Sequence, residues 1–281
     1  MSISVSEWYQ PDNERHRRYD EHGVIQVFDN GGKRYLCFGS ADEQSCLLRS
    51  QPTLLQHEYA RAMVAVLALV PPMPERCEHR VLDAEEEGAE ESDWPVTLLG
   101  LGGGTLALAL MAMQPNACIT AIELRKAVVL VARQYFFLPR TEQLRIEVMD
   151  AGAYLRTAPD RQARLLVSDL YLSEGADPQQ LQQQYIEDCW NHLADGGWLV
   201  VNLWREHRDQ VVWLGLLKQR FGQVLHATTT DGNWIVWAQK CEQVVELPIQ
   251  QKTQIRQRCK VLSERAGFNL WRSVKPFLRH G

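Results

Sequence analysis

Alternating apolar and polar residues first form a clear pattern near the beginning of the chain. Val24–Phe28 and Arg34–Phe38 alternate, and the turn Asp29–Gly32 between them contains Asn-Gly-Gly. This arrangement predicts a β-hairpin, because glycine adopts the positive φ that tight hairpin turns need. Residues 1–22 are polar, and we expect them to form a loosely held lead-in. The pattern predicts a small N-terminal β-region.

A helical pattern follows. The spacing of apolar residues in Leu54–Leu69 favours a buried helix, which Pro71 and Pro72 end because proline has no amide hydrogen to donate. Residues 83–93 then contain seven acids and no base, which predicts a surface loop.

From Pro95 onward, short apolar runs alternate with helical segments. The predicted strands are Val96–Leu99, Cys118–Ile122, Leu144–Val148, Arg164–Ser168 and Trp198–Asn202. The helices after the second to fifth strands are predicted at Lys126–Phe137, Ala151–Arg156, Gln179–Leu193 and Val211–Phe221. Val224–Thr228 and Trp234–Ala238 predict a closing antiparallel hairpin. The fold class is therefore α/β, with a Rossmann-like, doubly wound and mostly parallel sheet.

We expect four segments: a β-hairpin region with its linking helix at 1–75, an acidic loop at 76–94, the Rossmann-like domain at 95–240 and a basic helical tail at 241–281. The tryptophans of the Rossmann-like domain are expected in the core.

Composition narrows the setting. At 281 residues and 45% hydrophobic, the chain can bury a full core, and no apolar run reaches the ~20 residues of a membrane span. The beginning of the chain has no hydrophobic export signal, so we expect a cytoplasmic protein. The seven cysteines are scattered and never form a CxxC pair, which predicts reduced thiols and no metal site.

Charge is unevenly distributed. The net charge is -5, but the residues from Gln251 onward carry eight Lys and Arg against the single Glu264. We expect a solvated helical face there. Nucleic acid is not an expected partner, although the basic tail leaves it open.

The glycine turn after the first strand is the main indication of chemistry. Gly100 and Gly102–Gly104 separate a strand from a helix, and Glu123 closes the next strand. This order is how a βαβ unit holds an adenosine-containing cofactor, because the glycine backbone approaches the ligand closely and the acid accepts from ribose hydroxyls.

The later strand ends extend this site, because ligands of open α/β sheets lie across the carboxyl ends of the strands. Asp150 and the Ala151 backbone N–H suit the adenine amine and ring nitrogen, and Asp169 suits the ammonium of the cofactor's amino acid end. Asn202 follows the fifth strand. The alternative for each aspartate is a helix N-cap.

Three enzyme classes fit less well. The glycines are not spaced GxGxxG as in nicotinamide enzymes, no Gly-Lys-Ser/Thr follows as in a phosphate-binding loop, and no GxSxG elbow is present as in serine hydrolases.

From about Gly23 to Ala238 the sequence resembles the spermidine synthase family, and more closely its methyltransferase-like branch. The resemblance rests on Phe38-Gly39, Gln44-Ser45, Glu58-Tyr59, Met63, Leu99–Leu106, Ile122-Glu123, Asp150-Ala151, Ser168–Tyr171 and Leu193–Asn202. It implies a class I methyltransferase-type fold that binds S-adenosylmethionine or decarboxylated S-adenosylmethionine. It also implies a small-molecule substrate, such as an amine, and a homodimer. The implied cofactor contacts are Gln44, Gly100, Gly102, Gly103, Gly104, Glu123, Asp150, Ala151 and Asp169.

The sequence departs from aminopropyltransferases at positions that bear on chemistry. Gly103 and Leu172 stand where the resemblance leads us to expect acids, and Tyr59 lies one residue before the expected tyrosine, where Ala60 stands. Loss of a base disfavours aminopropyl transfer, because the attacking amine must lose a proton.

We therefore predict methyl transfer to an unidentified acceptor bordered by Asp169, Tyr171 and Tyr59. Aminopropyl transfer with Asp169 or Glu174 as base, and a non-catalytic nucleoside-binding or dimerisation module, are the alternatives.

Overall fold

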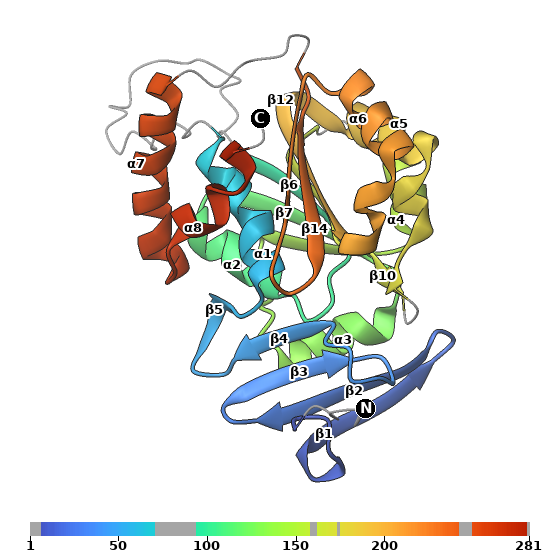
Figure 1. Cartoon of the computed structure of the whole chain (residues 1–281). Coiled ribbons are helices and arrows are strands. Elements are labelled where there is room, and N and C mark those ends of the chain that lie inside the picture. The colour runs from blue at the N-terminus through green and yellow to red at the C-terminus, as the bar shows by residue number, and fades with distance from the viewer. Residues whose placement is uncertain (1–6, 71–93, 158–161, 173–174, 242–248, 280–281) are drawn as a thin grey trace, which may run out of the picture.

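The computed structural model describes residues 7–70, 94–157, 162–172, 175–241 and 249–279. An N-terminal antiparallel sheet lies below a larger, mostly parallel sheet covered by helices (Figure 1). The acidic run at 83–93 lies outside the described residues, and the division into four segments stays a prediction. No helix in the described part of the chain is long and apolar enough to cross a membrane.

The N-terminal sheet has five antiparallel strands in sequential order. They are β1 (Glu14–Asp20), β2 (Gly23–Asn30), β3 (Lys33–Cys37), β4 (Ser45–Leu48) and β5 (Gln51–Leu55). The predicted hairpin is confirmed as β2 and β3, and Gly31 and Gly32 in its turn have φ of 57° and 80°. Both values lie where glycine is favoured.

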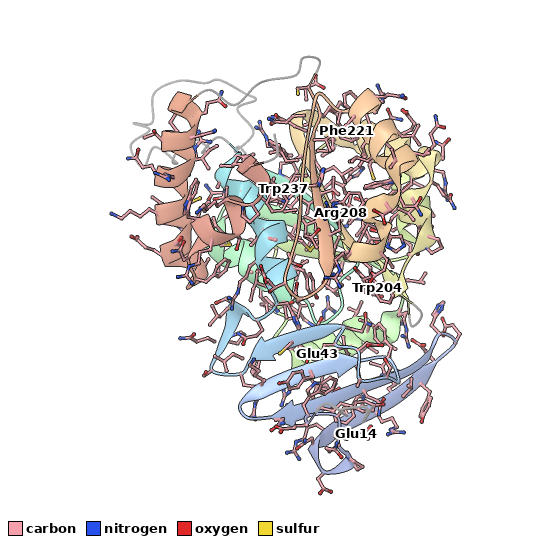
Figure 2. All side chains as sticks on the ribbon, in the orientation of Figure 1. Glu14, Glu43, Trp204, Arg208, Phe221 and Trp237 are labelled. Atoms are coloured by element: carbon pink, nitrogen blue, oxygen red, sulfur yellow. The ribbon has the colours of Figure 1, made fainter. Side chains whose placement is uncertain are left out.

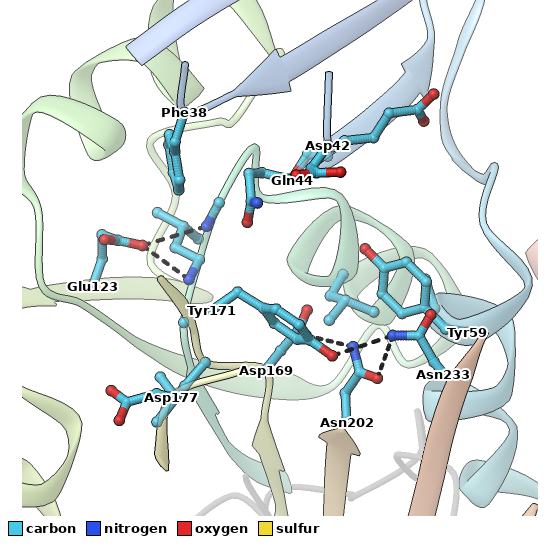
Figure 3. Close-up of a pocket in the computed structure, with 18 of the residues that line it drawn as sticks. Phe38, Asp42, Gln44, Tyr59, Glu123, Asp169, Tyr171, Asp177, Asn202 and Asn233 are labelled. Atoms are coloured by element: carbon cyan, nitrogen blue, oxygen red, sulfur yellow. Dashed lines mark hydrogen bonds between the residues drawn. The ribbon is translucent and has the colours of Figure 1, made fainter. Parts of the chain in front are cut away.

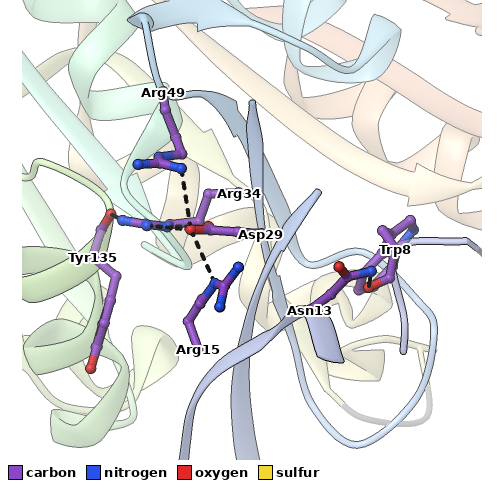
Figure 4. Close-up of polar contacts among 7 residues, drawn as sticks. All are labelled: Trp8, Asn13, Arg15, Asp29, Arg34, Arg49 and Tyr135. Atoms are coloured by element: carbon purple, nitrogen blue, oxygen red, sulfur yellow. Dashed lines mark hydrogen bonds and ion pairs between the residues drawn. The ribbon is translucent and has the colours of Figure 1, made fainter. Parts of the chain in front are cut away.

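The expected loose lead-in is wrong for residues 14–20, which form β1 and pair with β2. The side chains of β1 are exposed or half-buried, so this edge strand shows no apolar alternation in the sequence. Beside it, Asp29 accepts from the Arg34 guanidinium at 2.6 and 2.7 Å and forms an ion pair with Arg15 at 3.7 Å (Figure 4).

The helix predicted at Leu54–Leu69 is shorter than expected. Leu54 and Leu55 belong to β5, and the helix α1 (Glu58–Val64) starts three residues after that strand ends and continues as a 3-10 turn, η2 (Ala65–Ala68). Leu55 at the strand end and Ala60, Ala62 and Met63 in the helix are all buried, so the apolar spacing alone did not separate the two elements.

The main sheet has seven strands in the order β13-β14-β12-β9-β6-β7-β8. They are β6 (Trp94–Leu99), β7 (Ala117–Glu123), β8 (Leu144–Val148), β9 (Ala163–Ser168), β12 (Leu193–Trp204), β13 (Gln223–Thr228) and β14 (Asn233–Gln239). β6, β7, β8, β9 and β12 are parallel, and β14 and β13 close the sheet antiparallel. The predicted fold class is confirmed.

Helices cover both faces of this sheet (Figure 1). They are α2 (Thr105–Met113), α3 (Lys126–Tyr135), α4 (Ala151–Arg156), α5 (Gln183–His192), α6 (Val211–Arg220), α7 (Ile249–Ala266) and α8 (Leu270–Val274). One core cluster joins α1, α2, α7 and α8 to one face, and the other joins α4, α5 and α6 to the opposite face. Residues of α3 pack against the N-terminal sheet.

The basic tail is helical, as predicted, and it belongs to the core. Ile255, Cys259 and Leu262 of α7 are buried, whereas Lys252 and Lys260 are exposed. The 3-10 turn η5 (Phe277–Arg279) places the Phe277 ring on Trp237 of β14, with 3.6 Å between ring centroids. Trp237, labelled in Figure 2, belongs to the same core cluster as Leu270 and Val274 of α8. The tail therefore has a solvated basic face and a buried apolar face.

Candidate functional site

A pocket of about 900 Å³ lies at the carboxyl ends of the main-sheet strands, beside the N-terminal sheet (Figure 3). The residues that line it include Phe38, Asp42, Gln44, Tyr59, Gly100, Gly102, Glu123, Asp150, Ala151, Asp169, Tyr171, Asp177, Asn202, Trp204 and Asn233. It brings together Gln44, the strand-end acids and the two tyrosines singled out in the sequence.

The glycine turn forms the floor of the pocket and needs glycine on steric grounds. Gly100 and Gly102 have φ of 91° and 53°. A Cβ at Gly100 would collide with the backbone carbonyl of Asp169, and one at Gly102 would lie 2.8 Å from Oγ of Ser45. Both positions therefore need glycine for the turn to pack against Asp169 and Ser45.

Gly103 and Gly104 are not among the residues that line the pocket, and their contact with a cofactor stays a prediction. A Cβ at Gly103 would lie 2.7 Å from the Phe136 ring, and one at Gly104 would lie 2.6 Å from Leu138. The Gly103 N–H donates to Oγ of Ser45 at 2.8 Å. These two glycines allow close packing behind the turn, and an acid at position 103 would displace Phe136.

Glu123 holds the turn in place. Its Oε2 accepts from the backbone N–H of Leu101 at 3.1 Å and of Gly102 at 3.4 Å, and its Oε1 accepts from that of Arg125 at 2.9 Å. Burial raises the pKa of Glu123, against the lowering effect of these N–H donors. A carboxylate oxygen can accept more than one bond, so Glu123 can also accept from ribose hydroxyls.

Asp150 has the geometry of both roles considered in the sequence. Its Oδ1 accepts from the backbone N–H of Ala153 at 2.8 Å, so it is the N-cap of α4. Asp150 and Ala151 also line the pocket. The two roles are compatible because the cap uses Oδ1, so Oδ2 can accept from a ligand.

Asp169 lies directly after β9. Its Oδ1 accepts from the Asn202 amide at 2.9 Å. Burial raises the pKa of Asp169 to about 6, and the Asn202 hydrogen bond opposes that rise. The carboxylate is therefore ionised at neutral pH, close to the range in which a side chain exchanges protons readily.

The two predicted tyrosines meet at the same end of the pocket. The Tyr171 hydroxyl accepts from the Asn233 amide at 3.2 Å, and Tyr59 stacks on His57 with 5.2 Å between ring centroids. Burial, reinforced by the nearby Asp169 carboxylate, raises the pKa of both tyrosines. Both hydroxyls are therefore neutral hydrogen-bonding groups.

Asn233 and Trp204 are among the pocket residues that sequence reasoning did not single out. Asn233 falls between the two predicted strands of the closing hairpin, but it is the first residue of β14 and lines the pocket. Trp204 was expected in the core, but it is 40% exposed and lies 6.2 Å from Tyr171 between ring centroids. The sequence did indicate their neighbour Asn202, because it lies at the end of the fifth predicted strand.

Three side chains of the kinds that bind metals lie close together beside the pocket, although the sequence predicted no metal site. One donor atom each from Glu43, Cys46 and His57 lie within 4.8 Å of one another. Burial raises the pKa of Cys46 to about 12 and raises that of Glu43. Both shifts oppose the ionised forms that bind metals, and the His57 ring is already stacked on Tyr59.

No protein-family model matches the chain. A polyamine aminopropyltransferase of Neisseria meningitidis serogroup A is 27% identical over 222 residues, which cover 76% of this chain and 75% of the relative. An eEF1A lysine and N-terminal methyltransferase of Xenopus laevis is 22% identical over 215 residues, 72% of this chain and 27% of the relative.

Solved structures share the fold. A probable spermidine synthase from Corynebacterium glutamicum has a TM-score of 0.68 and 19% identity, covering 90% of this chain and 94% of its own. Human methyltransferase-like protein 13 in complex with SAH has a TM-score of 0.62 and 19% identity, covering 75% and 93%. The chain is thus similar in sequence to a polyamine aminopropyltransferase, and it shares its fold with a probable spermidine synthase and with a methyltransferase-like protein.

Proposed function

We propose that this chain is a transferase that binds S-adenosylmethionine and methylates a small nucleophilic acceptor. The cofactor would lie along the backbone of Gly100 and Gly102, and Glu123 would accept hydrogen bonds from the ribose hydroxyls. Asp150 and the Ala151 backbone N–H would hold the adenine. The observation that carries the proposal is the meeting of these strand-end groups in one pocket with Asp169.

The remaining groups of the pocket suit an acceptor. When bound, S-adenosylmethionine supplies a methyl group on a positively charged sulfur. Asp169, Tyr171 and Tyr59 would border the acceptor and orient it in line with this methyl group, with Asp169 and Tyr171 also in contact with the amino acid end of the cofactor. Positioning of this kind accounts for much of the rate in group transfer. Gln44 would close over the cofactor from the N-terminal sheet.

Aminopropyl transfer is the second candidate, favoured by the name of the Neisseria relative. The pocket lining also holds Asp42, Glu43, Asp177 and Asp231, whose charge would attract a polyamine. Leu172 disfavours aminopropyl transfer, because leucine cannot take a proton from the attacking amine. Glu174, the other alternative base, lies outside the described residues.

Isothermal titration calorimetry with S-adenosylmethionine and with its decarboxylated form tests this proposal. We expect S-adenosylmethionine to bind more tightly. Tighter binding of the decarboxylated form would favour aminopropyl transfer, and binding of neither would favour a non-catalytic module.

Two variants at one position make the test specific to the predicted adenine site. Asp150→Ala should abolish measurable binding and cost about 1 kcal/mol of stability through the lost cap. Asp150→Asn keeps a capping oxygen, so it should retain stability while still weakening binding, because its NH₂ cannot accept from the adenine amine. Unchanged affinity in both variants would contradict the adenine assignment.

A further inference from the structure

Four polar residues of the pocket, three from different strands and Asp169 from the loop after β9, form one hydrogen-bonded network (Figure 3). The Asn202 amide of β12 donates to Oδ1 of Asp169 at 2.9 Å. The Asn233 amide of β14 donates to Oδ1 of Asn202 at 2.9 Å and to the hydroxyl oxygen of Tyr171, in β10 (Tyr171–Leu172), at 3.2 Å. Asn233 is thus linked to Asp169 by way of Asn202, and it is hydrogen-bonded directly to Tyr171.

The carboxylate fixes the direction of this chain. An ionised carboxylate only accepts, so Asn202 must turn its nitrogen toward Asp169 and its oxygen toward Asn233. Asn233 must then present its own nitrogen. Asn202 is only 1% exposed, so a reversed amide would bury one oxygen against another with little access to water.

The two ends of the chain therefore offer opposite hydrogen-bonding groups to the pocket. Asp169 keeps its second oxygen as an acceptor. The Tyr171 oxygen accepts from Asn233, which leaves the hydroxyl hydrogen to donate.

The closing hairpin fixes Asn233 relative to the start of α1. Asp231 at its tip accepts from the backbone N–H of Tyr59 at 3.0 Å, and Glu58 accepts from the backbone N–H of Thr230 at 3.1 Å. The hairpin that ends the sheet thus also positions one residue of the pocket beside Tyr59.

We propose that Asn233 is a positioning residue that holds Asp169 as an acceptor, through Asn202, and Tyr171 as a donor. This inference rests on the proposed function, because it concerns the same pocket. The pair complements a ligand group that carries an N–H donor next to an oxygen acceptor. The amino acid end of S-adenosylmethionine has both, and the decarboxylated form lacks the oxygen.

Other charged and ionisable groups line the pocket and bear on its pH dependence. They include Tyr59 from α1, with His57 stacked on it, Glu43, Asp177, Asp231 from the hairpin tip, Tyr171 from β10, and Arg205 and Glu206 after β12. Burial keeps the two tyrosines neutral.

Calorimetry of the whole chain with S-adenosylmethionine, from mildly acidic to mildly alkaline pH, tests the inference through Asn233→Asp. Aspartate has the shape of asparagine but accepts where Asn233 donates. The Asn202 amide then turns its nitrogen to the new carboxylate and its oxygen to Asp169. We expect about tenfold weaker binding at neutral pH and a binding midpoint at higher pH than in the wild type, because Asp169 becomes harder to ionise.

Two controls separate this role from a structural one. Thr230→Ala removes the hydroxyl that donates to Glu58 and leaves the Asp169–Asn202–Asn233–Tyr171 network intact, so it should lower Tm and leave the pH midpoint unchanged. In an Asp169→Asn background, Asn233→Asp should cause no shift of that midpoint, because the group whose ionisation it reports is gone.

The outcomes distinguish the two proposals. If the wild type fails to bind S-adenosylmethionine at every pH, the proposed function is wrong. If the wild type binds and Asn233→Asp has the wild-type midpoint, or Thr230→Ala shifts it equally, the positioning role is wrong while the proposed function stands.

Discussion

Asp169 is the residue at which stability and function oppose each other. Burial raises its pKa from the ordinary 3.8 to about 6, so folding favours its neutral form. The stabilising contribution of this group is fully present below 3.8 and is lost as pH rises through about 6. At neutral pH the folded protein therefore holds a carboxylate that would be better solvated in the unfolded chain.

Replacing Asp169 by asparagine should stabilise the protein. The amide can still accept from Asn202 and carries no charge, so Asp169→Asn should raise the free energy of unfolding at mildly alkaline pH by on the order of 2 kcal/mol. The gain should vanish below pH 3.8, the ordinary pKa of the group. Urea unfolding at both pH values measures it. Asp195→Asn, at a carboxylate with 99% exposure, is the matched control and should change little.

The sequence located the acids of the site better than their partners. Glu123, Asp150 and Asp169 follow from one rule, the use of strand ends in open α/β sheets. Asn233 could not be found this way, because its contact with Asn202 depends on how the antiparallel hairpin returns beside β12. Trp204 was missed because a tryptophan near a strand end is usually core.

At the scale of elements, the basic C-terminal tail packs against the core, although its charge predicted only a solvated helical face. Its basic residues drew attention in the sequence, but α7 has buried residues at positions 255, 259, 262 and 266, which is the spacing of a helix packed on one face. The same limit applies to β1, whose backbone pairing leaves no trace in its polar side chains.

Phe277 should be among the residues that hold this tail. It is 1% exposed and its ring stacks on Trp237. Phe277→Ala should therefore cost about 3 to 5 kcal/mol of unfolding free energy, measured by urea unfolding. Val261→Ala on the exposed face of α7, where the side chain is 50% exposed, should cost under about 0.5 kcal/mol. Equal effects of the two changes would contradict the packing assigned to the tail.

At the scale of the whole molecule, the two sheets build one pocket. Ser45 of β4 accepts from the Gly103 N–H, and Arg125, two residues after Glu123, donates to Asp20 of β1 at 2.7 and 3.0 Å. The N-terminal sheet therefore supports the glycine turn directly. The order of strands and helices in the main sheet was predictable from periodicity, whereas the docking of the N-terminal sheet depends on these tertiary contacts. The cytoplasmic setting and the homodimer stay predictions.

The central claim is that this pocket holds an S-adenosyl compound along the glycine turn. A crystal structure of the chain with S-adenosylhomocysteine tests it most directly. We predict ribose hydroxyls hydrogen-bonded to Glu123, adenine beside Asp150 and Ala151, and the amino acid end between Asp169 and Tyr171. A nucleoside bound away from Glu123 and Asp150, or no bound ligand at saturating concentration, would contradict the account.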